Sequence, residues 1–174
     1  MKKFILILLF SILTSVHIQA KELNPKNILE TLQRFYVDFK GGDELLQKAQ
    51  GYLVFPEVYK AGLVVGGSYG EGALVQNGAI NSYYRMYGTS VGIQAGARKN
   101  SMIILFLTKE ALNRFINKEE WKVGVDGSIS VLHWSKGTDL SSLDLKKDTV
   151  AIVFNDLGVM LNLSLNGTVF QKLR

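Results

Sequence analysis

The stretch GLVVGGSYGEGALVQNGAINSYYRM, residues 62–86, decides the fold class. It is rich in valine, tyrosine and glycine, and its short apolar runs are typical of β-strands. The dipeptide Asn77-Gly78 separates two of these runs. A two-residue type I′ turn needs positive φ at both central positions, which asparagine and glycine tolerate best. The stretch therefore predicts an antiparallel hairpin.

Similar short apolar runs continue on both sides of this hairpin. We expect strands over residues 52–55, 62–69, 72–76, 79–86, 89–95, 102–107, 121–133, 149–155 and 159–166, and a last strand from Thr168. Arg98-Lys99-Asn100 is expected to be a turn, and residues 135–147 a long polar loop. Because no long helix separates consecutive strands, a parallel doubly wound fold is not expected.

Helical spacing of apolar residues predicts helices around this sheet. Asn24 caps the first helix, Pro25 takes its first position, and Gly41-Gly42 ends it. Shorter helices are expected over residues 43–50 and over 109–117, the latter capped by Thr108. The fold class that follows is α+β, with N-terminal helices packed on a many-stranded, strongly curved antiparallel sheet. Closure of this sheet into a barrel stays open as an alternative.

The N-terminus has the layout of a secretory signal peptide. Lys2 and Lys3 precede an apolar run over residues 4–13, and small and polar residues follow as far as Ala20. A membrane span needs roughly 20 apolar residues, so a permanent anchor would have to continue through Ile18. We expect a signal peptide over residues 1–20, cleavage near Ala20, one domain over residues 21–174, and a periplasmic or secreted location.

Composition excludes several classes of partner and cofactor. Cleavage would leave 18 basic and 15 acidic residues, and the basic ones are spread along the chain. A nucleic-acid reader normally gathers them on one face, so we expect no nucleic-acid partner. The chain has no cysteine, and His133 is the one histidine beyond the signal peptide. Disulfides and ordinary zinc sites are therefore not expected, and neither is a cofactor.

Glycines at even spacing mark one face of the predicted strands. Gly62, Gly66 and Gly70 are four residues apart, as are Gly92 and Gly96. Glycine in a strand indicates strong curvature, a bulge, or the close approach of another backbone or a ligand. Two interpretations follow: a tightly coiled sheet with a helix pressed on it, or a groove for lipid.

Residues 66–70 formally match the G-x-S-x-G nucleophile elbow, with Ser68 at its centre. Asp126 and His133 even follow in the order of a hydrolase triad. The elbow requires a strand, a turn and then a helix, whereas the residues after Ser68 are predicted to continue as strand. We therefore expect no catalytic residue, and a serine hydrolase using Ser68 stays the weakest alternative.

Glu71 is a charged residue between glycines in a predicted strand. A buried carboxylate costs several kcal/mol unless it is paired. We expect Glu71 either to pair with a cation such as Lys60 or Arg85, or to face solvent.

Several linked motifs resemble the SYLF domain family. They are LVFP (53–56), KAG (60–62), GGSYGEG (66–72), GIQAGA (92–97), WKVGVDG (121–127) and the closing residues 153–158. The glycines of the motif are Gly66, Gly67, Gly70, Gly72, Gly92 and Gly96. The resemblance extends from about Leu45 to the end of the chain.

The resemblance implies a non-enzymatic lipid-binding domain that acts on acidic phospholipid or on a membrane surface. Eukaryotic members bind acidic phospholipids and phosphoinositides, and some bind and bundle actin filaments. Bacterial members are commonly exported. The alternative that the family suggests is a protein-interaction or structural module. Many exported relatives carry a lipobox cysteine, which this chain lacks, so contact with a membrane would need the protein's own surface.

Two sets of basic residues are candidates for that surface. Lys60, Arg98 and Lys99 lie beside the glycine-rich strands, and each basic residue near an anionic surface contributes about 1 kcal/mol. The helix over residues 24–40 is the second candidate, as an interfacial helix whose apolar stripe is flanked by Lys26, Arg34 and Lys40. Packing of that stripe against the core is the alternative for the helix.

Overall fold

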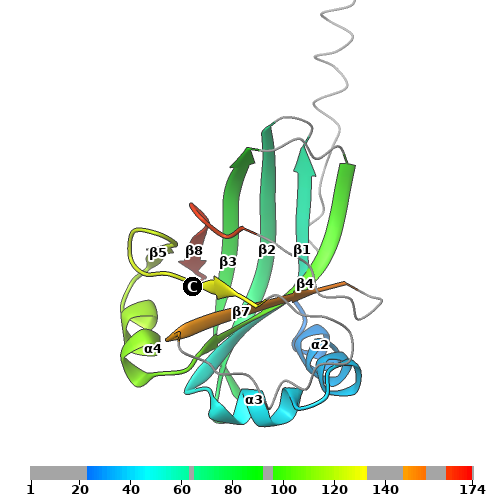
Figure 1. The fold of residues 1–174 in the computed structure, drawn as a ribbon, viewed down its shortest axis with the longest axis vertical. Helices are drawn as coiled ribbons and strands as arrows, with labels where there is room; N and C mark the ends of the chain where they lie inside the picture. The colour runs from blue at the N-terminus through cyan, green and yellow to red at the C-terminus, as the bar shows by residue number, and fades with distance from the viewer. Residues whose placement is uncertain (1–22, 63–64, 92–95, 133–146, 156–163, 174) are drawn as a thin grey trace, which may run out of the picture.

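The computed structural model describes residues 23–62, 65–91, 96–132, 147–155 and 164–173, so the expected signal peptide lies outside the described residues. The helices and strands of these ranges are shown in Figure 1. In chain order they are α2 (Pro25–Asp38), α3 (Gly42–Lys48), β1 (Gly51–Gly62), β2 (Val65–Gln76), β3 (Ala79–Val91), β4 (Gly96–Phe106), α4 (Lys109–Ile116), β5 (Glu120–Lys122), β6 (Ser130–Val131), β7 (Thr149–Phe154) and β8 (Val169–Lys172).

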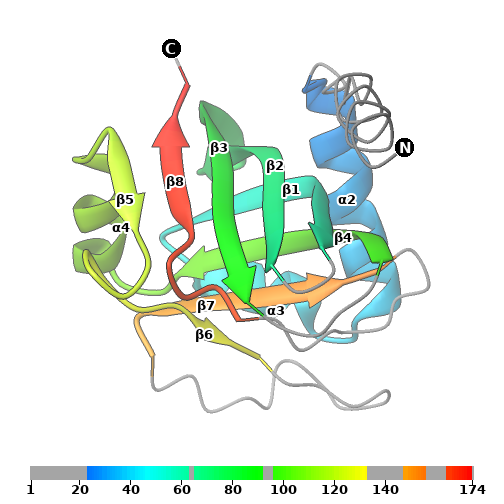
Figure 2. The ribbon, with the colours of Figure 1, turned by 90° about the horizontal axis from the view of Figure 1, so that it is seen from above.

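The strands form one sheet in the order β5-β8-β3-β2-β1-β4-β7-β6. Neighbours are antiparallel except β6 and β7, which are parallel, so the expectation of a purely antiparallel sheet was wrong at that end. The sheet curves strongly, and β7 and β6 curl in front of the central strands (Figures 1 and 2). Because its order ends at β5 and β6 within the described residues, the sheet is an open half-barrel. The α+β class is confirmed.

The central strands are longer than the sequence predicts. β2 and β3 each run without a break through glycines that were expected to interrupt them. The turn expected at residues 98–100 was wrong, because these residues lie inside β4 and pair with β1. Their charged side chains tolerate a strand because Arg98 and Lys99 lie at an exposed part of the sheet.

In contrast to the central strands, the strand predicted over residues 121–133 is shorter in the structure. β5 ends at Lys122, and a turn with Gly124 at φ 88° separates it from the two residues of β6. His133 lies outside the described residues, as do residues 135–146 of the expected loop and 159–163 of the strand expected over 159–166.

β1 continues past its expected end at Phe55 because of a bulge. Its register shifts between Val54 and Glu57 relative to β2, and between Phe55 and Val58 relative to β4. Pro56 lies within this bulge, where a residue without an N–H is tolerated because the ladder is locally interrupted. Its carbonyl oxygen accepts a hydrogen bond of 2.8 Å from the Ser101 hydroxyl.

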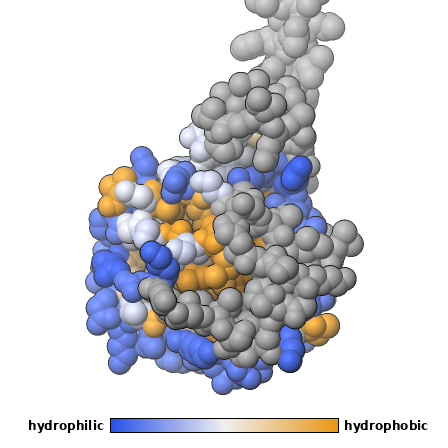
Figure 3. All heavy atoms as spheres, in the orientation of Figure 1, coloured by the Kyte–Doolittle hydropathy of each residue, from blue (hydrophilic) through white to orange (hydrophobic). Residues whose placement is uncertain are grey.

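Apolar side chains cover both faces of the sheet. The first core, on the concave face, packs α4 and Trp121 against the sheet and contains Leu53, Phe55, Leu74, Tyr84, Met86, Met102, Ile104, Phe106, Phe115, Val153 and Phe170 among others. The second core packs α2 and α3 on the opposite face and includes Ile28, Leu32, Phe35, Val54, Ala73, Ile103, Leu105, Ile152 and Phe154. Figure 3 shows apolar residues at the centre of the concave side, with hydrophilic residues around them.

α2 and α4 begin as the sequence predicts, whereas α3 begins at Gly42, one residue before its expected start. The Asn24 side chain accepts a hydrogen bond of 2.9 Å from the Lys26 N–H, and Thr108 accepts one of 3.1 Å from the Ala111 N–H. The apolar stripe of α2 is buried, which confirms core packing rather than an interfacial role for that stripe. Tyr36 of the same helix is 44% exposed and lies outside the buried stripe.

The expected hairpin turn is confirmed, because Asn77 and Gly78 have φ values of 51° and 75°.

Candidate functional site

The far ends of β1 to β4 extend beyond both cores. We call residues 59–62, 65–69, 87–91 and 96–99 the distal sheet; its strands stand above the rest of the molecule in Figure 1. The last buried residues before it are Val58, Gly70, Met86 and Asn100. Within the distal sheet, every residue whose exposure is described is at least partly exposed. Among the residues whose exposure is described, both faces of the distal sheet carry at least partly exposed side chains.

Lys60 and Arg98 face each other on one side of the distal sheet. They are directly paired across β1 and β4, and Ser68 pairs with Lys60 from β2. Burial lowers the pKa of the half-buried Lys60 ammonium, while Arg98 is exposed. Within the described residues, no hydrogen bond or ion pair joins either side chain to a partner. Two unpaired cations side by side favour an anion between them.

The glycine motif and this cation pair meet on the same face. Gly66, Gly62 and Gly96 form one row across β2, β1 and β4, directly beyond the row of Ser68, Lys60 and Arg98. Small residues therefore border the two cations, and a ligand can approach the backbone closely there. Gly92 lies outside the described residues.

Gly70 and Gly72 have a packing role instead. A Cβ on Gly70 would lie 2.9 Å from the Glu57 carbonyl oxygen, and one on Gly72 would lie 2.4 Å from that of Val54. Both contacts are with β1 at its bulge. This supports the interpretation of the glycines as marks of a tightly coiled sheet. Gly67 is different, because the nearest heavy atom to its Cβ position is the Gly88 oxygen at 3.9 Å.

Lys99, the third basic residue expected at the site, lies on the opposite face of the sheet. It is paired with Tyr59 across the strands, and its ammonium group lies 3.3 Å from the Glu57 carboxylate. The structure therefore brings Lys60 and Arg98 together and separates Lys99 from them.

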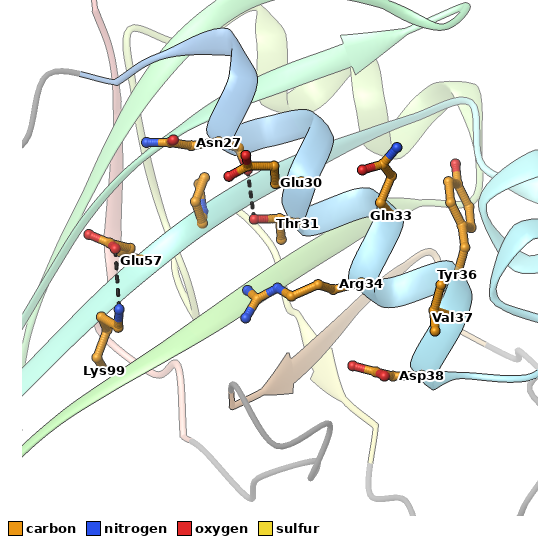
Figure 4. A pocket seen from close by; sticks show the side chains of 11 residues that line it. Asn27, Glu30, Thr31, Gln33, Arg34, Tyr36, Val37, Asp38, Glu57 and Lys99 are labelled. Atoms are coloured by element: carbon orange, nitrogen blue, oxygen red, sulfur yellow. Dashed lines mark hydrogen bonds and ion pairs between the residues drawn. The ribbon is translucent and has the colours of Figure 1, made fainter.

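A groove of about 780 Å³ lies between α2 and this opposite face. Figure 4 shows Arg34 reaching from α2 across the groove, toward the strands that carry Glu57 and Lys99. The Arg34 guanidinium donates a hydrogen bond of 2.7 Å to Ser101 and lies 5.9 Å from the centre of the Phe154 ring. Arg34 is thus held by the sheet and is not an anchor on a free helix surface.

Three tyrosines form a row on the same face as Lys99, and no sequence pattern named above predicted this row. Tyr59, Tyr69 and Tyr87 are paired in register across β1, β2 and β3. Their hydroxyl groups donate to carboxylates of Glu57 at 2.5 Å, Glu71 at 2.6 Å and Glu120 at 3.3 Å, respectively. A tyrosine two positions from a glutamate in both β1 and β2 is the signal that could have revealed this row.

Glu71 has the partner that the sequence analysis expected. Its carboxylate lies 3.1 Å from the Arg85 guanidinium, directly across β2 and β3, and is partly buried. The same guanidinium lies 5.8 Å from the centre of the Tyr69 ring. Arg85 therefore joins a carboxylate and an aromatic ring of the row.

Ser68 does not lie in a nucleophile elbow. β2 continues through Ser68 to Gln76, so no helix follows the serine. Its hydroxyl contacts the Gly88 carbonyl at 3.4 Å. Asp126 accepts hydrogen bonds from the Lys118 ammonium and from the Lys122 N–H, which lower the pKa of its carboxyl group. These two hydrogen bonds give Asp126 a structural role in the turn after β5.

The described ranges lack both a cluster of metal-ligating residues and a membrane-spanning helix. They contain no group of three or more histidine, cysteine, aspartate or glutamate residues that could hold a metal ion. Among the helices described, none has the length and apolar character needed to cross a bilayer.

Comparison with known proteins places the chain in a family. The profile of the Ysc84 family, described as Las17-binding protein actin regulator, matches residues 87–173, half of the chain. The matched part contains Arg98 and the strands from β4 onward, while the motifs over residues 53–72 precede it. No curated protein matches the sequence. The match agrees with the motifs that resemble the SYLF domain, and the chain belongs to the Ysc84 (SYLF) family.

Proposed function

We propose that this protein is an exported, non-enzymatic lipid-binding domain that contacts acidic phospholipid through Lys60 and Arg98. The observation that carries the proposal is the pairing of these two cations across β1 and β4 without an ion-pair partner in the described residues. Burial lowers the pKa of Lys60, and a phosphate beside its ammonium group would favour the charged form.

The surroundings of the pair suit a membrane surface. The two cations lie near the ends of their strands, where the distal sheet projects beyond both cores. The bordering glycines remove side chains that would hold a headgroup at a distance. Two basic residues contribute about 2 kcal/mol at an anionic surface, which corresponds to about a 30-fold change in affinity.

Co-sedimentation with vesicles tests this function. We expect the protein to sediment with phosphatidylglycerol-containing vesicles, less at high salt, and not with pure phosphatidylcholine vesicles. Replacing both Lys60 and Arg98 by glutamine should weaken binding about 30-fold. Lys99→Gln is the matched control, because Lys99 lies on the other face and should matter little. Equal losses in the control and the double variant, or no binding by the wild type, would refute the site.

A protein-interaction function is the second candidate, and the tyrosine row favours it. Tyr59 and Tyr87 are 40% and 37% exposed, and tyrosine is enriched at the centres of protein interfaces. The hydrogen bonds to carboxylates hold the rings in place before a partner arrives. The description of the family names Las17 and actin, so a filament-binding partner is the natural one to test.

Sedimentation with actin filaments tests the second function. Binding should fall at least tenfold when Tyr59 and Tyr87 are both replaced by alanine, since interface tyrosines contribute more than about 1.4 kcal/mol when they act as hot spots. Tyr36→Ala is the control, because Tyr36 is equally exposed but lies on α2, away from the row. A wild-type protein that stays in the supernatant would exclude actin as the partner.

A further inference from the structure

Three large apolar side chains of α2 point to solvent rather than into the second core. Leu29, Tyr36 and Val37 are 61%, 44% and 84% exposed, and they make up half of the large hydrophobic residues exposed across the described ranges. Gln33 is also exposed and lies about one helical turn from each of them. We call Leu29, Gln33, Tyr36 and Val37 the outer stripe of α2. Apolar residues that adjoin on one exposed face mark a docking surface, whereas scattered single ones need no explanation.

The outer stripe is presented on a helix that the core holds in place. The opposite side of α2 buries Ile28, Leu32 and Phe35 in the second core. Figure 2 shows α2 at the rim of the molecule, on the side away from β5 and α4. Gln33, Tyr36 and Val37 also line the groove beside α2, but in Figure 4 they lie on the side of the helix away from the strands of the sheet.

The charges beside the outer stripe favour a protein partner over an acidic membrane. The Glu30 carboxylate lies 3.6 Å from the Lys26 ammonium group, and both side chains are exposed. This pair leaves the border of the stripe without net charge, and the Glu30 carboxylate would be repelled by an acidic headgroup. An apolar centre with a polar rim is typical of protein interfaces.

The spacing of the outer stripe makes it complementary to itself. Residues seven apart lie almost on one line along an α-helix, because two turns take about 7.2 residues. Leu29 and Tyr36 form one such line. Glu30 and Val37 form the next, and Gln33 lies near the middle of both. An antiparallel copy related by a twofold axis at Gln33 therefore brings Leu29 of each chain to Tyr36 of the other, and Val37 to the aliphatic part of Glu30.

We propose that a second copy of this chain docks on the outer stripe, so that two antiparallel α2 helices form a symmetric dimer about Gln33. A twofold axis makes each contact twice, which is how one surface binds a copy of itself. A helix of 14 residues is about 21 Å long, so the contact is small and the dimer should exchange with monomer. The proposal is independent of the lipid and of actin, because its residues belong to neither the cation pair nor the tyrosine row.

Sedimentation equilibrium of the protein, purified as the cell produces it, tests the proposal. Between about 5 and 500 µM the average mass should rise from that of one chain toward that of two. Val37→Glu should weaken dimerisation at least about tenfold, because it places a carboxylate opposite Glu30 of the second copy. Val125→Glu is the matched control, since Val125 is 73% exposed but lies in the turn after β5, and this variant should dimerise like the wild type.

Cysteine cross-linking tests the symmetry of the dimer. The chain has no cysteine, so Gln33→Cys introduces the one thiol of the protein. Two such thiols meet at the twofold axis, where copper–phenanthroline should oxidise them to a disulfide-linked dimer. Glu110→Cys, at an exposed position of α4, is the control and should give a much lower yield.

Three outcomes would overturn the proposal. The first is a mass that stays that of one chain at every concentration, and the second is equal dimerisation of the two valine variants. The third is a Gln33→Cys protein that cross-links no better than Glu110→Cys, because another face would then join the copies. If the protein stays monomeric and Val37→Glu instead reduces sedimentation with phosphatidylglycerol vesicles, the outer stripe contacts lipid and the second copy is the wrong partner.

Discussion

Gly72 on β2 is packed against the backbone of Val54 on β1: a Cβ on Gly72 would lie 2.4 Å from the Val54 carbonyl oxygen. The Phe55 ring lies on the same side, with its Cδ1 atom 2.6 Å from that position. Both neighbours adjoin the β1 bulge, so the glycine permits the bulge to pack on β2.

Replacing Gly72 by alanine should lower the free energy of unfolding by about 3 kcal/mol, the cost of overpacking a rigid site. The carbonyl oxygen belongs to the backbone and cannot move aside without breaking the ladder. Urea denaturation measures the change. Gly67→Ala is the control, because its nearest heavy atom is 3.9 Å away, and it should change stability by less than about 0.5 kcal/mol. Similar losses in both variants would contradict the close contact.

Ser101 connects α2 to the bulge. Its hydroxyl accepts from Arg34 at 2.7 Å and donates to the Pro56 carbonyl at 2.8 Å, and the residue is 1% exposed. Ser101→Ala should cost about 2 kcal/mol, since it leaves a buried carbonyl and a guanidinium each without one partner. Thermal denaturation compares it with Ser164→Ala, an exposed serine for which little change is expected. An unchanged melting temperature in Ser101→Ala would show that water replaces the hydroxyl.

The Tyr59 hydroxyl should ionise at a higher pH than an ordinary tyrosine. The hydrogen bond to Glu57, followed by burial and the glutamate charge, raises the pKa of Tyr59 to about 12, from an ordinary value of 10.0. The raised pKa means that the protonated Tyr59 hydroxyl stabilises the folded state. This stabilisation is fully present below pH 10 and is lost as the pH rises through about 12, because Tyr59 of the unfolded chain ionises at the lower pH. The difference in tyrosinate absorbance between wild type and Tyr59→Phe isolates this group. In Glu57→Ala the titration of Tyr59 should move toward pH 10. If it does not move, the hydrogen bond to Glu57 is not the cause of the raised pKa.

The N-cap of α4 should be a measurable part of the stability. Thr108 accepts the Ala111 N–H at 3.1 Å, and the helix carries Phe115 into the first core. Thr108→Ala is expected to cost about 1 kcal/mol, and Thr108→Ser should restore most of it, because serine retains the capping oxygen. Chemical denaturation of the three proteins gives the comparison. Equal stability of the serine and alanine variants would argue against capping.

Export is testable by mass spectrometry. When the full chain is produced in a bacterium with a secretory pathway, the periplasmic fraction should contain a protein that begins at Lys21, because the cleavage is proposed after Ala20. A full-length mass in the membrane fraction would instead favour an uncleaved anchor through Ile18.

The helices and the first hairpin were predictable because local chemistry determines them. Capping by Asn24 and Thr108 and the turn at Asn77-Gly78 depend on residues that are neighbours in the chain. Glu71 also pairs with Arg85, one of the two expected cations, because a charged side chain in a strand can reach few cross-strand neighbours.

The lengths of the central strands were not predictable from local patterns. The first strand was expected to end at residue 55 and a turn was expected at residues 98–100, yet β1 continues to Gly62 and pairs with residues 98–100 of β4. The same pairing decides the site. It brings Lys60 to Arg98 and turns Lys99 to the other face, and the tyrosine row exists only when β1, β2 and β3 are aligned.

β7 has consequences for how the protein unfolds. All its residues are buried, and its side chains alternate between the first core, through Val153, and the second, through Ile152 and Phe154. Loss of this strand would expose both cores at once, so neither can melt while the other persists. We infer that the described part of the chain unfolds in a single cooperative transition, and that its slowest amide hydrogen exchange occurs in β4 and β7.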